Sequence, residues 1–70
     1  MWAIGERRVV VSTRLGDGGV YWTLVLLEYR GDNVLKWVAV EELKEKFATR
    51  AEAVEEAKLF REATGVGFVT

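Results

Sequence analysis

The stretch that decides the fold is "VYWTLVLLEYR", residues 20–30. Its aromatic and branched residues are typical of a β-strand, yet apolar side chains stand at both even and odd positions. Because side chains alternate across a strand, one face carries Val20, Trp22, Leu24 and Leu26, and the other carries Tyr21, Thr23, Val25, Leu27 and Tyr29. We therefore expect a central strand that carries apolar side chains on both faces, each of which needs to be covered.

Glycine-rich breaks flank this strand, "GDGG" at 16–19 and "GDN" at 31–33. Short spacers of this kind between apolar runs indicate hairpin turns, so residues 7–15, 20–30 and 34–40 are predicted to form an antiparallel meander. A four-residue loop at 16–19 sets the first register, whose expected pairs are Leu15–Val20, Thr13–Trp22, Val11–Leu24, Val9–Leu26 and Arg7–Glu28, the last an ion pair.

The second turn fixes the faces of the third strand. A two-residue turn at Gly31 and Asp32 places Leu35, Trp37 and Ala39 on the side of Trp22. The opposite side then carries Lys36, Val38 and Val40. Trp22 and Trp37 are thus expected in the core.

A helix is predicted over residues 50–63. Thr49 and Glu52 form a capping box, and Gly65 can take the left-handed position that ends a helix. The apolar stripe of this helix is Ala53, Val54, Ala57, Phe60 and Thr64. It is expected to cover the face of the sheet that holds Trp22.

Two segments are open to more than one interpretation. Residues 41–47, "EELKEKF", suit a helix or a continued strand, and we favour extended or irregular structure because a charged edge strand discourages aggregation. The tail "VGFVT", 66–70, can add a short edge strand. We expect one α+β domain over residues 1–70, a three-stranded antiparallel meander packed on one C-terminal helix, with a fourth strand left open.

Composition excludes most catalytic chemistry. The 70 residues contain neither His nor Cys, which removes the usual nucleophile–base pairs, imidazole and thiolate metal sites, and disulfides. The "GDGG" turn lacks the Gly-Lys-Ser/Thr ending of a phosphate-binding loop. Glu41, Glu42 and Glu45 are better explained as a solvated face paired with lysines than as a cation site. We expect no enzyme activity, no cofactor, no metal and no small-molecule substrate.

The expected location is the cytoplasm. The longest apolar run, Val20 to Leu27, falls far short of the ~20 residues of a membrane helix, and residues 1–14 lack a signal-peptide centre. Abundant Val, Glu, Lys and Arg beside one Asn and no Gln also suggest a thermophile-like composition.

The face away from the helix is the expected functional surface. A monomer seldom leaves such a patch in water, so a partner is predicted. Candidate contacts to a single-stranded nucleic acid are Arg7, Arg8, Arg14, Tyr21, Tyr29, Arg30 and Lys36, since cations bind phosphates and aromatic rings stack on bases. Candidate residues of a homodimer interface are Val10, Val25, Leu27, Val38 and Val40.

Two resemblances bear on this surface. "IGERRVVV" at 4–11 and "LVLLEYR" at 24–30 resemble the positive cofactor four family of single-stranded-DNA-binding coactivators, small dimers with a curved antiparallel sheet and a helix. That resemblance implies backbone contacts for Arg7, Arg8 and Arg14 and implicates Tyr29 and Arg30. Residues 34–65 are similar to generic three-strand-plus-helix modules, including plant ethylene-response DNA-binding domains, in which the sheet docks in a DNA groove.

The sequence therefore predicts a non-enzymatic nucleic-acid-binding protein, homodimeric and favouring single strands. The alternative is a structural or protein-interaction module that dimerises or docks a partner through the same face. The net charge of −1 gives no support to coating of duplex DNA by bulk electrostatics.

Overall fold

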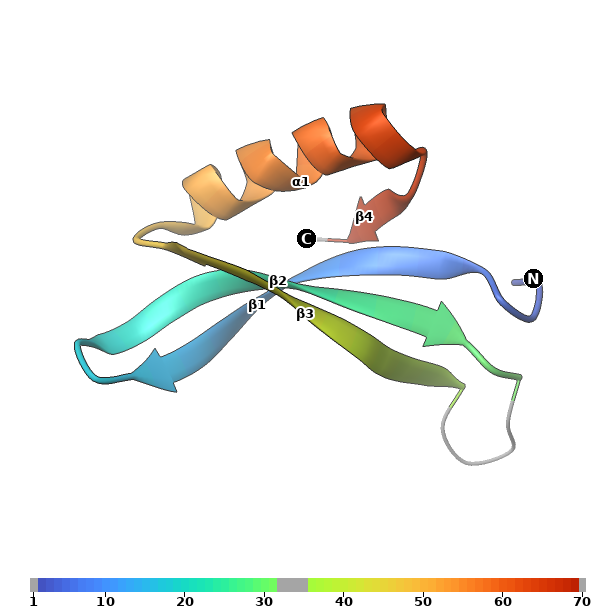
Figure 1. The fold of residues 1–70 in the computed structure, drawn as a ribbon, viewed down its shortest axis with the longest axis horizontal. Coiled ribbons are helices and arrows are strands. Elements are labelled where there is room, and N and C mark those ends of the chain that lie inside the picture. Colours follow the sequence, from blue (N-terminus) through green and yellow to red (C-terminus); the bar gives the residue numbers. More distant parts are fainter. Residues whose placement is uncertain (1, 32–35, 70) are drawn as a thin grey trace.

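The protein adopts an α+β fold with one mixed sheet and one helix (Figure 1). The structure is a computed structural model that describes residues 2–31 and 36–69, the side chain of Lys44 excepted. The elements are β1 (Arg7–Gly16), β2 (Gly19–Tyr29), β3 (Trp37–Phe47), α1 (Arg50–Thr64) and β4 (Gly67–Val69). The strand order is β3-β2-β1-β4, and α1 lies across one face of the sheet.

The first hairpin has the predicted register. Leu15 lies opposite Val20, and the pairing continues without a shift to Arg7 opposite Glu28. The expected ion pair at that end forms, with Arg7 Nη2 3.2 Å from Glu28 Oε1. The predicted four-residue loop is wrong, however, because Gly16 pairs with Gly19 and leaves a two-residue loop of Asp17 and Gly18, which gives the same register.

The second hairpin has a different register. Of the predicted turn at Gly31 and Asp32, Gly31 is described and Asp32 is not, and Leu35 also lies outside the described residues. Beyond them Tyr29, not the expected Leu26, lies opposite Trp37, and the Arg30 N–H donates to the Lys36 carbonyl at 2.7 Å. This shift of three residues is odd and exchanges the sides, because the side-chain period of a strand is two. The predicted faces of Lys36, Trp37, Val38 and Ala39 are wrong for that reason.

Strand β3 continues through the ambiguous segment and ends at Phe47, so residues 41–47 are strand. It is irregular, with register shifts where Leu26 gives way to Leu27 and where Trp22 gives way to Leu24. Extra residues on β3 accommodate both shifts, as in β-bulges, which bend and twist a strand. One result is that both Leu43 and Phe47 turn toward the helix side, opposite Leu24 and Trp22.

The helix begins and ends close to the predicted positions. The Thr49 hydroxyl accepts a hydrogen bond from the Glu52 N–H at 3.2 Å and donates to its carboxylate at 3.1 Å. Gly65 closes the last turn with φ of 80°, and its N–H donates to the Arg61 carbonyl at 2.7 Å. That φ is left-handed, where glycine has no Cβ to clash.

The core lies between α1 and the sheet. Its buried residues are Val9, Leu24, Leu26, Ala53 and Ala57. Partly buried side chains pack around them: Val11, Trp22, Leu43, Phe47, Phe60, Val66 and Phe68. Because the two helix residues at the centre are alanines, the helix backbone can approach the sheet closely.

The tail forms β4, the strand that the sequence left open. It pairs parallel to β1, with Phe68 opposite Val9. A three-stranded meander with a helix is therefore an incomplete description, since the sheet is mixed and four-stranded. In the described residues no helix is both long and apolar enough to cross a membrane.

Candidate functional site

The face of the sheet away from α1 brings together part of the predicted nucleic-acid set. Arg8 lies opposite Leu27 and Arg14 opposite Tyr21, and Tyr29 follows on the same side of β2. Val10 and Val25 also share this face, which we call the open face.

The other predicted contacts do not join the open face. Arg7 and Arg30 both pair with Glu28, at 3.2 and 2.7 Å, on the side of the sheet that α1 covers further along. Alternation from Trp37 puts Lys36 and Val38 on that side too. Val40 lies in the bulge between the residues opposite Leu27 and Leu26, with 38% of its surface exposed.

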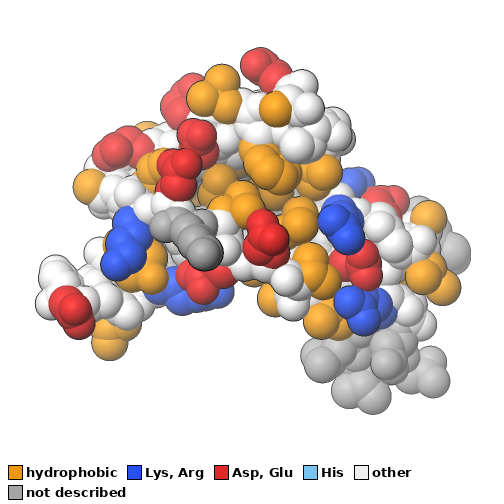
Figure 2. All heavy atoms as spheres, in the orientation of Figure 1, with side chains coloured by type: hydrophobic (Ala, Val, Ile, Leu, Met, Phe, Trp, Pro, Cys, Tyr) orange, Lys and Arg blue, Asp and Glu red, His pale blue; other side chains and the backbone are white. Residues whose placement is uncertain are grey.

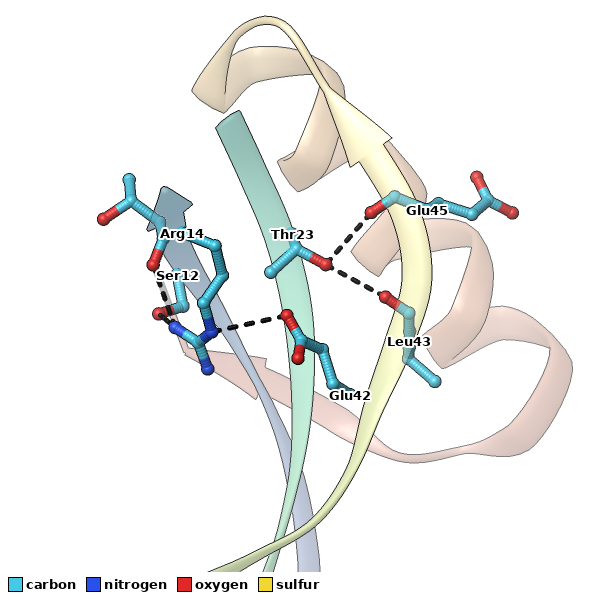
Figure 3. A network of polar contacts seen from close by, with 7 residues as sticks. Ser12, Arg14, Thr23, Glu42, Leu43 and Glu45 are labelled. Carbon is cyan, nitrogen blue, oxygen red and sulfur yellow. Dashed lines mark hydrogen bonds and ion pairs between the residues drawn. The ribbon is translucent and has the colours of Figure 1, made fainter. Parts of the chain in front are cut away.

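Carboxylates match the arginines of the open face. Arg8 lies 2.7 Å from Glu6, and Arg14 lies 3.3 Å from Glu42 across the central strand (Figure 3). Arg14 also donates to the Ser12 hydroxyl at 2.8 Å. These cations are therefore already partnered within the chain.

The centre of the open face is closed by the chain itself. Thr23 is 1% exposed and Val25 is 5% exposed. The Thr23 hydroxyl lies 2.9 and 3.0 Å from the carbonyls of Leu43 and Glu45 and shares its one proton between them, so the bulged part of β3 folds against it (Figure 3). Val25, which was expected to contribute to a solvent-exposed interface, is instead buried within the chain.

One end of the open face carries an aromatic cluster of Trp2, Tyr29 and Trp37. Their ring centroids lie 5.3–5.7 Å apart with tilted or edge-on geometry. The N-terminal turn is held there by hydrogen bonds of 2.8 Å from the Gly5 N–H to the Tyr29 carbonyl and from the Tyr29 N–H to the Glu6 carbonyl. Trp37 was expected in the core. Because of the register shift it packs in this cluster instead.

A groove of about 620 Å³ lies on the opposite side, between β3 and α1. Its apolar lining comes from Leu24 and Leu43 of the sheet and from Leu59, Phe60 and Ala63 of the helix. Its charged lining consists of Glu41, Glu42, Glu45 and Glu56. Figure 2 shows hydrophobic side chains gathered beneath the helix, with acidic and basic side chains around them.

The groove follows from helix geometry. Residues 56, 59, 60 and 63 follow the i, i+3, i+4, i+7 spacing and form one line along α1. This line lies beside the stripe that holds Ala53 and Ala57, on the side toward β3. Leu59 remains 57% exposed at its edge.

The charged residues described along the groove all carry the same sign. Glu42 is paired with Arg14, whereas Glu41, Glu45 and Glu56 form no ion pair with the described side chains, which exclude that of Lys44. Within residues 2–31 and 36–69 no group of acidic side chains converges as metal ligands would. The three glutamates line the groove together with its apolar residues, Glu41 and Glu45 from β3 and Glu56 from α1.

Sequence reasoning missed the helix side of this groove. Leu59 and Ala63 were left out of the predicted apolar stripe of the helix. The sequence did contain a signal. Leu59, directly before Phe60, makes the apolar stripe of the helix wider than packing against the sheet alone requires.

Comparison with known proteins gives the chain no relatives. It matches no family model, no curated protein and no solved structure, so the geometry of its surfaces is what carries a functional conclusion.

Proposed function

We propose that the chain is a protein-interaction module that docks a polypeptide segment in the groove between β3 and α1. The observation that carries this proposal is Leu59, 57% exposed, beside an apolar groove of about 620 Å³. Grooves of this size and lining suit side chains of a partner, and recognition of a segment by an apolar groove is a recurrent mode of binding.

Charge favours a polypeptide over a nucleic acid as the occupant. Glu41, Glu45 and Glu56 at the groove would repel phosphates, which bind where Lys and Arg gather. The same carboxylates also disfavour an anionic lipid surface. A protein segment can supply apolar groups that pack on the apolar lining and cationic groups that pair with the glutamates.

Selection from a displayed library of random peptides tests the proposal without presupposing peptide charge. Peptides selected on the wild-type chain would be measured against Ala63→Trp, which fills the groove, and Ala51→Trp, a matched change on the solvent side of α1. We expect binding to fall at least tenfold for Ala63→Trp and to stay unchanged for Ala51→Trp. Equal binding to all three proteins, or no selected peptide, would refute docking in the groove.

Nucleic-acid binding through the open face is a second candidate. It is supported by the shared position of Arg8, Arg14, Tyr21 and Tyr29, and by Lys46, whose Nζ lies 5.0 Å from the Tyr21 ring centroid. A phosphate would have to displace Glu6 from Arg8 and Glu42 from Arg14, which lowers the net gain.

A single-stranded oligonucleotide titrated at low salt tests this candidate. Binding should weaken steeply with salt and weaken further in Arg8→Ala/Arg14→Ala, whereas Lys58→Ala on α1 should bind like the wild type. Absence of binding at micromolar protein in low salt would eliminate it.

The homodimer remains a proposal with a smaller interface than expected. Among its predicted residues, Val25 is buried and Val38 faces the other side. This leaves Val10 and Leu27, partly exposed on the open face, and Val40, exposed in the bulge of β3. Sedimentation of the wild-type chain at increasing concentration tests it, and a monomer throughout would rule it out.

A further inference from the structure

We infer that the segment recognised by the groove is an amphipathic helix whose apolar face is flanked on both sides by Lys or Arg. This inference rests on the proposed function and specifies the chemistry of the partner. Its basis is that, among the described side chains, which exclude that of Lys44, the charged residues lining the groove are glutamates, and that they lie on two different elements.

The positions of these glutamates require cations on both flanks. Glu41 and Glu45 are exposed on β3, and Glu56 lies on α1, in the row of helix residues that lines the other side of the groove. An occupant with its apolar face toward Leu24 and Leu43 presents one flank to β3 and the other to α1. Lysines on both flanks then meet opposite charges, which promotes encounter and fixes orientation.

The irregularity of β3 argues for a helix over an added strand. Although β3 is an edge strand, its two register irregularities interrupt the regular row of N–H and C=O groups that a new strand would need. Recognition must therefore rely on side chains, as when the apolar face of a helix packs in a groove.

A second copy of this chain does not have the required surface. In the described residues α1 is the one helix, and its exposed side carries Glu55 and Glu62 beside Lys58 and Arg61. The occupant is therefore a segment of different sequence.

Three synthetic peptides test the inference. The first is helix-forming, with Leu at i, i+3, i+4 and i+7 and Lys on both flanks; the second has Glu in place of each Lys; the third has the first composition in scrambled order. Fluorescence anisotropy would follow each peptide against the wild-type chain. We expect the first to bind at least tenfold more tightly than the others and to weaken as salt is raised.

Matched variants of the protein locate the charge effect. Glu41→Gln, Glu45→Gln and Glu56→Gln combined should weaken the lysine peptide at least tenfold. Glu62→Gln, on the far side of α1, should leave binding unchanged. Circular dichroism confirms that the variants keep their helix, so a loss of binding is not a loss of fold.

The outcomes separate this inference from the proposed function. Equal binding of the lysine and glutamate peptides, or an equal loss in Glu62→Gln and the triple variant, overturns the inference. If neutral or acidic peptides selected from the library bind in the groove while the lysine peptide does not, the inference fails and the docking function stands. If no peptide of either kind depends on the groove, both fail.

Discussion

At the scale of single residues, Thr23 shows how a polar group can organise the centre of a sheet. It is nearly fully buried, and its hydroxyl is the partner of two carbonyls in the bulged part of β3. Carbonyls that are partly shielded from water cost free energy when they lose their partner, so the hydroxyl stabilises the bulge.

Thr23→Val keeps the shape of the side chain but removes this donor. We expect the free energy of unfolding to fall by about 1–3 kcal/mol, because the Leu43 and Glu45 carbonyls lose their hydrogen bond. Urea denaturation measures it, with Thr13→Val at an exposed position of β1 as the matched control. A Thr23→Val midpoint equal to that of the control would contradict this role.

Val25→Lys distinguishes a side chain buried within one chain from a side chain that forms a dimer interface. Since Val25 is 5% exposed within one chain, the lysine must desolvate its charge or force the strands apart. We expect unfolding to be easier by at least about 2 kcal/mol at every protein concentration. A variant that unfolds like the wild type, but sediments as a smaller species, would restore Val25 as an interface residue.

At the scale of elements, α1 serves two surfaces at once. Ala53 and Ala57 pack against the sheet, and the neighbouring line with Leu59 and Ala63 forms a wall of the groove. The helix must therefore keep its length to its last turn, which Gly65 closes.

Gly65→Ala tests that closure. The left-handed φ of 80° costs a residue with a Cβ about 1–2 kcal/mol, so thermal unfolding should begin at lower temperature. Gly18→Ala is the control. The φ of Gly18 is not positive, and the space that its new Cβ would occupy is open. Equal melting temperatures of the two variants would contradict the strain argument.

Trp2→Ala tests the aromatic cluster that ties the N-terminal turn to β2 and β3. Loss of its contacts with Tyr29 and Trp37, each worth about 0.5–1.5 kcal/mol, should destabilise the fold and reduce the near-ultraviolet circular dichroism. Leu15→Ala removes a more exposed apolar side chain at the tip of the first hairpin and should change neither. A near-ultraviolet spectrum of Trp2→Ala identical to the wild type would show that the rings are not fixed together.

The elements differ in how far the sequence predicts them. The first hairpin and the helix are local: a glycine-rich loop, a cross-strand ion pair, a cap residue and a closing glycine are all readable in the chain. The second hairpin is not, because "GDN" suits loops of different length and an odd change of length exchanges the sides of the β3 residues that precede the bulge at Val40. That exchange moved Trp37 to the open face and Val38 away from it.

The groove was beyond sequence reasoning for a different reason. Its residues come from β2, β3 and α1, and its width depends on how the helix lies across a twisted sheet with bulges. Exposure of Leu59 is visible only once that angle is known. The charges of Glu41 and Glu45 are evident in the sequence, but their place in the lining of the groove is not.

At the scale of the whole molecule, the small size of the chain makes binding and stability strongly linked. A domain of this size buries only about 60% of its unfolded surface, so its own stability is modest. A ligand that binds the folded state alone adds about 2.7 kcal/mol at 100 times its dissociation constant.

A groove-binding peptide at that concentration should raise the melting temperature by about 10 °C or more, since each kcal/mol shifts a domain of this size by about 4–8 °C. Differential scanning fluorimetry measures the shift. Ala63→Trp should show none with the same peptide. A similar shift in that variant would place the peptide elsewhere on the molecule.

The parallel pairing of β4 with β1 joins the last strand of the fold to the first. Along Arg8–Val10, both edges of β1 are occupied only after Gly67–Val69 have docked. The amide protons of this stretch should therefore exchange with solvent deuterium more slowly than those of Ser12–Leu15, where β1 pairs with β2 alone.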